Sequence, residues 1–475
     1  MNGGWTWLSD FSVIAILIAG IWLFRYPRRA KAGNLAAAAA VGLAFVLVVL
    51  RNAVLDPGIV VAFIVVGSAA GWIVAGRANM IQIPAMVAFQ HGAGGVAAFL
   101  VATVELVRES VALGAVGAVA GVLAMLVGAG TFSASMIASA KLANVMRSTA
   151  IVLPRHNVVI LTVAAAAVVL GAGSAADTGG AAIVCVAAAI ISAIVLGIVF
   201  AVRVGGADMP VLISFLNATA GLAAAFCGII IGNRLLIACG ATVAASGSIL
   251  TYVMCAAMNR GLSKVFVGIG APSAVAPLPE GEAAETSRTT PDLSNETSTS
   301  PSVGGDPHAM AIEALRSAGS VIVVPGLGMA MSQAQFEVVA LADRLERRGA
   351  HVRFAIHPVA GRMPGHMHVL LGEAEVDYAK LFDLKDINAD FAETDLALVV
   401  GACDVVNPAA ATTEGTPISG MDILRAYEAK QVIVCNLDDR PGYSGVPNAL
   451  YESPKAILLF DDAKATIARF LSELE

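Results

Sequence analysis

Long apolar stretches fill the first half of the chain. Runs long enough to cross a membrane as a helix, about 20 residues, occur at 8–24, 34–50, 57–76, 83–106, 111–138, 157–173, 181–202, 210–231 and 235–257. Gly and Ala dominate many of them, as in GATVAASGSILTYVMC at 240–255. Because small residues let helix backbones approach closely, we predict a polytopic α-helical membrane bundle with about nine spans.

A different pattern begins after residue 307. Apolar runs at 321–326, 351–359, 396–404, 431–436 and 456–460 alternate with amphipathic segments such as AQFEVVALADRLERRG. Alternating β and α segments predict a soluble α/β Rossmann-like domain, in which helices cover both faces of a parallel sheet. Ligands of such sheets bind beyond the carboxyl ends of the strands.

The segment between the two patterns, residues 271–307, is rich in Pro, Ser, Thr, Glu and Gly and nearly lacks large apolar residues. Such a composition cannot bury enough surface to offset the entropy of ordering. We therefore expect a transmembrane domain at 1–263, a hinge and flexible linker at 264–307, and a soluble domain at 308–475.

Composition agrees with this division. Hydrophobic residues make up 57% of the 475 and charged residues 13%, against about 25% charged in soluble proteins. The net charge of −6 gives no indication of nucleic-acid binding. The six cysteines form neither a CxxC motif nor a cluster with histidine, which argues against zinc and against a disulfide framework.

Lys and Arg are distributed unevenly over the predicted loops. With the amino terminus outside, the inner loops hold eleven of these residues and the outer loops three. Short loops rich in Lys and Arg stay in the cytoplasm. An odd number of spans then places the carboxyl-terminal domain in the cytoplasm.

His91 is the one ionisable side chain well inside a predicted span. Such groups are costly in lipid and usually face the bundle interior or water, and an imidazole both takes and releases protons near neutral pH. A neutral histidine bonded to a neighbouring helix is the alternative. Asn217 and Asn233 lie near the last two spans, where either could support a proton-carrying water chain or make an ordinary interhelical contact or loop cap.

The stretch VIVVPGLGMAMSQAQ, residues 321–335, reads as a strand, a glycine turn and a helix start. Gly326 and Gly328 form G-x-G, and Met331 stands where the third small residue of a dinucleotide fingerprint usually falls. Glycines there let the backbone approach a pyrophosphate, although a simple tight turn has the same signature. The acidic residue expected about 20 residues onward in an NAD site is absent. Arg353, His357 and Arg362 occupy that region instead and would suit phosphates.

Two further segments follow predicted strands. HPVAGRMPGHM, residues 357–367, reads as a shaped loop because of its Gly and Pro. GACDVVNPAA, residues 401–410, places Asp404 and Asn407 at a strand end, where Asp404 could equally be a helix cap.

Together, VPGLGMAMSQAQ, HPVAGRMPGHM, GACDVVNPAA and GYSGVPNALY resemble the beta subunit of proton-translocating nicotinamide nucleotide transhydrogenase. The likeness extends to IPAMVAFQH and GNRLLIACGATVAASGSILTYVMCAAMNR in the membrane half and covers nearly the whole chain. The resemblance implies a soluble domain that binds NADP(H), a separate alpha subunit that binds NAD(H), and direct hydride transfer coupled to a proton crossing the membrane.

The resemblance also implies roles for individual residues. His91 and Asn233 correspond to the membrane histidine and asparagine of the family, and Tyr443 to a tyrosine that folds over the cofactor. The residues implied to contact the nucleotide are Gly326, Leu327, Gly328, Met329, Ala330, His357, Ala360, Arg362 and Asp404.

The sequence departs from the family at two places. Before GY the family usually carries Lys-Arg-Ser, which holds the 2′-phosphate of NADP(H), whereas this chain has Asn436, Leu437 and Asp438, followed by Asp439 and Arg440. Either Arg440 or Arg362 supplies the lost charge, or the preference for NADP(H) over NAD(H) is weakened. Cys403 stands where the family usually has Asn.

The leading hypothesis is an energy-linked transhydrogenase subunit of the bacterial plasma membrane. The chain holds no second dinucleotide fingerprint, so we expect an alpha-subunit partner with further membrane helices, and a dimer of such heteromers. The rival hypothesis is a nucleotide-gated transporter or channel whose tail senses the cofactor without catalysis.

Overall fold

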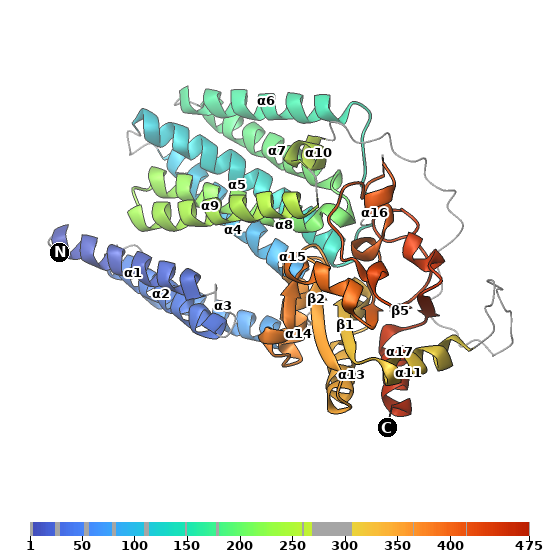
Figure 1. The fold of residues 1–475 in the computed structure, drawn as a ribbon. Coiled ribbons are helices and arrows are strands. Elements are labelled where there is room, and N and C mark those ends of the chain that lie inside the picture. Colours follow the sequence, from blue (N-terminus) through green and yellow to red (C-terminus); the bar gives the residue numbers. More distant parts are fainter. Residues whose placement is uncertain are drawn as a thin grey trace, which may run out of the picture. The chain divides into compact units, whose positions relative to one another are not determined.

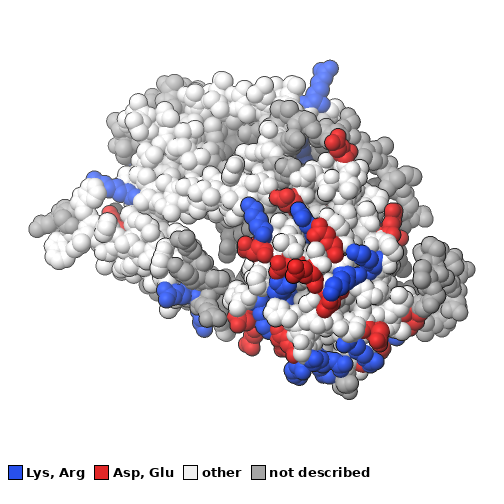
Figure 2. Space-filling model, viewed as in Figure 1, with Lys and Arg blue, Asp and Glu red and all other residues white. Residues whose placement is uncertain are grey.

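The computed structural model describes residues 3–23, 29–51, 57–77, 82–108, 114–147, 150–176, 180–258, 261–267, 306–363, 365–414 and 416–474. Most of the predicted linker therefore lies outside the described residues. The chain divides into a helical unit, which takes in residues 1–256, and a second unit, which takes in most of 257–475. In Figure 2, acidic and basic side chains gather over the second unit.

The helical unit contains a helix at each predicted span. These are α1 (Gly3–Leu23), α2 (Ala30–Arg51), α3 (Pro57–Arg77), α4 (Ile83–Val107), α5 (Ala115–Leu142), α6 (His156–Ala176), α7 (Gly180–Val202), α8 (Met209–Ile230) and α9 (Arg234–Ala257) (Figure 1). Eight of them are long and apolar enough to cross a membrane, and α3 has a shorter apolar stretch, Val61–Val74. The predicted polytopic membrane bundle is therefore confirmed.

Glycines allow the central helices to approach closely, as the composition predicts. A Cβ atom on Gly95 of α4 would lie 2.7 Å from the carbonyl oxygen of Gly128 in α5, and a Cβ on Gly128 would lie 2.8 Å from the Gly95 oxygen. Real Cβ contacts essentially never fall below 3.0 Å. Any side chain at these two positions would therefore push α4 and α5 apart.

The second unit contains one parallel sheet with strand order β3-β2-β1-β4-β5-β6. The strands are β1 (Ser320–Pro325), β2 (His351–Ile356), β3 (Leu381–Asp383), β4 (Leu396–Val400), β5 (Gln431–Asn436) and β6 (Ala456–Phe460). This is the doubly wound dinucleotide-binding order, with its switch point between β1 and β4. The predicted Rossmann-like class is confirmed, and β3 is the strand that the hydrophobic pattern does not reveal.

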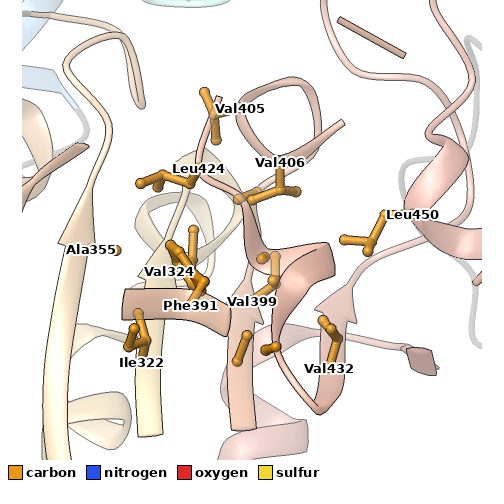
Figure 3. Close-up of a cluster of buried hydrophobic side chains, with 14 of the residues drawn as sticks. Ile322, Val324, Ala355, Phe391, Val399, Val405, Val406, Leu424, Val432 and Leu450 are labelled. Carbon is orange, nitrogen blue, oxygen red and sulfur yellow. The ribbon is translucent and has the colours of Figure 1, made fainter. Parts of the chain in front are cut away.

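Three helices of the second unit pack against strands of the sheet. Helices α11 (Pro307–Ser317), α13 (Gln335–Arg347) and α17 (Ala463–Glu473) contact β6, β2 and β5, respectively. Short elements complete the unit: α10 (Leu262–Val267), α12 (Leu327–Met331), α14 (His366–Glu373), α15 (Leu384–Ile387), α16 (Ala409–Thr412) and the 3-10 helices η4 (Tyr378–Lys380), η5 (Asn388–Glu393), η6 (Asp404–Val406), η7 (Ala426–Glu428) and η8 (Ala449–Glu452). In Figure 3, Ile322, Val399 and Val432 of the sheet belong to one buried apolar cluster with Phe391 and Leu424. This core holds the strand ends in fixed register.

Candidate functional site at the carboxyl edge of the sheet

The glycine turn after β1 interlocks with the turn after β4. The Gly326 N–H donates to the Val400 oxygen and the Gly328 N–H to the Gly401 oxygen, both at 2.8 Å. Gly401 has φ +67°, and a Cβ there would lie 2.1 Å from the Met329 nitrogen. At the switch point, Gly326, Gly328 and Gly401 therefore bring the two backbone turns into direct contact with no Cβ atom of their own between them.

The glycine turn leads directly into α12, which carries the remaining residues predicted for the turn. Met329 and Ala330 are buried, whereas Leu327 and Gly328 are half-buried. The N–H groups of Gly326 and Gly328 already donate to Val400 and Gly401, so the main contribution of the two glycines is to allow the close approach of a phosphate to the backbone. The arrangement fits the pyrophosphate of a dinucleotide.

His357 follows β2 and is almost completely buried. Its Nδ1 accepts from the Val359 N–H at 3.2 Å, and its Nε2 lies 2.7 Å from the Asp422 carbonyl oxygen, which can only accept. These partners assign the proton to Nε2, and burial lowers the pKa of His357 to about 4. His357 is thus neutral and holds this loop through its two hydrogen bonds. It is not the positive group that the sequence pattern favoured.

The other two cations near β2 have different positions. Arg353 forms an ion pair with Asp390 and lies over the Phe382 ring, 5.9 Å from its centroid. Arg362 belongs to the loop after His357, beyond Ala360, whose N–H donates to the His357 oxygen at 3.0 Å. Arg353 therefore has an acidic partner, Asp390, within its own domain.

Asp404 follows β4 and binds a segment far along the chain. Its Oδ1 accepts from the Ser444 hydroxyl at 2.5 Å and its Oδ2 from the Ser444 N–H at 3.0 Å. A Cβ on Gly442 would lie within 2.9 Å of this carboxylate. Asp404 therefore holds the Gly442–Ser444 segment across the end of β4, next to the half-exposed Tyr443.

Asn436 ends β5 with its amide turned inward. Its Nδ2 donates to the Ala402 oxygen at 2.9 Å and to the Tyr451 hydroxyl at 2.6 Å. Its Oδ1 is buried and has no hydrogen-bond partner among the described residues. Burial and the neighbouring Asp404 charge raise the pKa of the Cys403 thiol, which stays protonated beside this group.

Residues 437–440 form the outer rim at this point. Leu437 is 73% exposed. The Asp438 Oδ1 accepts from the Arg440 N–H at 3.1 Å, and its Oδ2 lies 3.7 Å from the Arg440 Nε. The guanidinium thus has a carboxylate as its neighbour.

Ser444 and Tyr451 are site residues that sequence reasoning missed. Both lie within GYSGVPNALY, in which the family resemblance points only to Tyr443. A hydroxyl that bonds a residue 40 positions away leaves no periodic signal. Among the described residues, no group of His, Cys, Asp and Glu could hold a metal ion.

In the helical unit, His91 lies on α4, with its Nδ1 buried and without a hydrogen-bond partner among the described residues. Asn217 is half-buried on α8, which contacts α4. Each of the two lies eight residues beyond the first residue of its helix, Ile83 and Met209. At 1.5 Å per residue, each side chain therefore lies about 12 Å along its own helix from that helix's first residue.

Asn233 occupies a different level. It follows the end of α8, roughly 20 Å along the axis from Asn217, and its Oδ1 accepts from the Leu236 N–H at 3.1 Å at the start of α9. The structure gives Asn233 the contact of a helix cap. Any role in moving protons stays a prediction for all three residues.

Comparison with known proteins agrees with this architecture. A sequence model of the family described as NAD(P) transhydrogenase beta subunit matches residues 7–473. The NAD(P) transhydrogenase subunit beta of Rhodospirillum rubrum is 39% identical over 468 residues, which cover 96% of this chain and 97% of that protein. The protein of the same name from a named strain of that species gives the same figures. The chain therefore belongs to the NAD(P) transhydrogenase beta subunit family.

Proposed function

We propose that this chain binds NADP(H) in its α/β domain and exchanges hydride with NAD(H) held by an alpha subunit, while a proton crosses the membrane through its helical unit. One observation carries the proposal, namely that a single member of this family contains two parts. The first is a doubly wound sheet whose switch point is shaped by glycines. The second is a set of helices long and apolar enough to cross a membrane, one of which carries the buried ring nitrogen of His91.

The bound nicotinamide would supply the hydride chemistry, so no side chain needs to act as an acid or base on it. The task of the domain is to bind and orient. The Gly326–Ala330 turn would hold the pyrophosphate, and the loop around His357, Ala360 and Arg362 would bind on the β2 side. On the β4 and β5 side, the Asp404–Ser444 hydrogen bonds hold the segment that carries Tyr443.

His91 is the group we assign to take up and release the proton. A buried imidazole nitrogen without a protein partner is suited to a water molecule, since buried polar groups are nearly always hydrogen-bonded. Asn217, on the helix α8 that contacts α4, would share that water. Asn233, near the other end of α8, would act at the far side of the path.

The chain cannot complete the reaction alone, because the second nucleotide needs a site of its own. We assign that site to the alpha subunit, with a dimer of heteromers in the bacterial plasma membrane. The eleven-to-three excess of Lys and Arg in alternate loops supports placing the α/β domain in the cytoplasm.

The direct test is reconstitution of the purified chain with its alpha subunit. Hydride transfer from NADH to an NADP⁺ analogue whose reduced form absorbs at its own wavelength should require both subunits. Transfer that persists without this chain, or nucleotide binding without any transfer by the complete complex, would contradict the proposal. The second result would favour a sensor of nucleotides over an enzyme.

A further inference from the structure

The β5 end of the sheet presents acceptors of hydrogen bonds where a phosphate would need donors. The segment from Asn436 to Arg440 contains two carboxylates, Asp438 and Asp439, and a single cation. A phosphate group is bound by cationic or N–H donors. A ribose hydroxyl, by contrast, donates to a carboxylate or an amide oxygen.

Asn436 supplies the best-defined of these acceptors. Its amide orientation is fixed, because Nδ2 donates to the Ala402 carbonyl, which can only accept, at 2.9 Å. The Oδ1 atom is therefore the group left over, buried and without a protein partner in the described part of the chain. A buried acceptor in this state destabilises the fold unless a ligand or a water molecule donates to it.

Arg440 is the one cation of the segment, and its geometry does not favour a phosphate. Its side chain is 79% exposed and pairs with Asp438, of which 45% is exposed. The Asp438 carboxylate also accepts from the Arg440 backbone N–H. A phosphate bound by Arg440 would therefore meet the charge of Asp438, and that of Asp439 next to it.

The β2 end does not offer a ready replacement. His357 is neutral, with both ring nitrogens engaged by backbone groups. Arg353 is paired with Asp390. Arg362 is the remaining cation of that loop, and it provides a distinct alternative that a variant can test.

From these contacts we infer that this domain receives the adenosine ribose as a free 2′,3′-diol, held by Asn436 Oδ1 and the Asp438 carboxylate, and so accepts NAD(H) about as well as NADP(H). The inference rests on the proposed function and on the place that the family resemblance gives the 2′ position, at residues 436–438. It names a specificity of this chain that the family description leaves open.

The test uses the full-length chain and titrates NADPH and NADH separately, with binding followed by calorimetry. For the unmodified chain we expect dissociation constants within about tenfold of each other. The variant Leu437→Arg/Asp438→Ser changes two exposed side chains and should fold normally. It should bind NADPH at least about tenfold more tightly relative to NADH, because it removes a repulsive carboxylate and adds a bidentate donor.

Asp438→Ser alone gives a sharper sign. It should weaken the binding of NADH, because the ribose hydroxyl loses its acceptor. It should strengthen the binding of NADPH, because the phosphate loses a repulsive neighbour. The matched control is Asp343→Lys, which makes the same change in charge as the double variant on the exposed face of α13 and should leave the NADPH to NADH ratio unchanged.

Two results would overturn the inference. One is an unmodified chain that binds NADPH more than about a hundredfold tighter than NADH. The other is a ratio of NADPH affinity to NADH affinity that is unchanged by the substitutions at 437 and 438 but falls sharply in Arg362→Gln. That result would place the phosphate at the β2 end. A chain that binds neither nucleotide would instead count against the proposed function itself.

Discussion

Replacing Gly401 by alanine tests whether the interlocked turns shape the nucleotide site. The new Cβ would lie 2.1 Å from the Met329 nitrogen and 2.4 Å from the Gly328 Cα. The β1 turn would have to move by about 1 Å to restore an ordinary contact. That shift would stretch the 2.8 Å bond from the Gly328 N–H and the 2.9 Å bond from the Gly401 N–H to the Cys435 oxygen.

The magnitudes add to a measurable loss. Alanine at φ +67° costs about 1 kcal/mol, and each weakened hydrogen bond about 1 kcal/mol. A total near 3 kcal/mol would lower the melting temperature of a domain of this size by roughly 6–12 °C. The displaced turn should also weaken dinucleotide binding by at least about tenfold.

The assay is thermal unfolding and nucleotide titration of residues 306–475. Gly349→Ala is the control, because Gly349 also has a positive φ, +97°, but its Cβ would meet nothing within 4 Å. It should cost only about 1 kcal/mol and leave affinity intact. Equal losses in the two variants, or normal binding by the Gly401 variant, would refute the role assigned to the close approach.

Three further predictions concern single side chains. His91→Asn should abolish proton-coupled turnover of the complex while the separated soluble domains still exchange hydride; loss of both activities would remove its assigned role. Ser444→Ala breaks the hydroxyl bond to Asp404 and, since bonds to charged groups contribute about 1.5–3 kcal/mol, should raise the nucleotide dissociation rate about tenfold in stopped flow; an unchanged rate would mean that the segment closes without it. Because the pKa of His357 in the folded domain, about 4, lies below the ordinary histidine value of 6.5, the folded domain binds fewer protons than the unfolded chain. The contribution of neutral His357 to the free energy of unfolding is fully present above pH 6.5. As the pH falls toward 4, the free energy of unfolding should decrease by about 3 kcal/mol. Denaturant titrations should show this slope and should show it flattened in His357→Gln, whereas equal slopes would contradict the assignment.

The sequence predicted the large elements because their signals are long. A run of about 20 apolar residues has few interpretations, and each predicted span coincides with a helix, including 157–173, which lies within α6. Strands β1, β4 and β5 were found because they are buried on both faces and therefore uniformly apolar. Strand β3, Leu381–Asp383, has three residues, and α14 begins inside the glycine-rich segment that was read only as a loop. Neither is long enough to show a period.

The site was predictable where backbone geometry decides it and not where tertiary partners do. The glycine turn after β1 is encoded locally. The neutrality of His357 comes from its burial in the folded domain, and its tautomer is set by the Asp422 oxygen, 65 residues away. The hydrogen bonds between Asp404 and Ser444 span 40 residues. Asn233 shows the reverse case, since its cap contact lies within three residues, and the sequence already offered a loop cap as its alternative.

The central claim is that hydride transfer at the sheet edge and protonation in the helical unit belong to one cycle. It is tested most directly by sealing the purified complex into vesicles and following internal pH while NADH reduces an NADP⁺ analogue. We predict that the reaction builds a pH gradient and that an imposed gradient changes its rate, with both effects absent in His91→Asn. Rapid hydride transfer that neither builds a gradient nor responds to one would contradict the account.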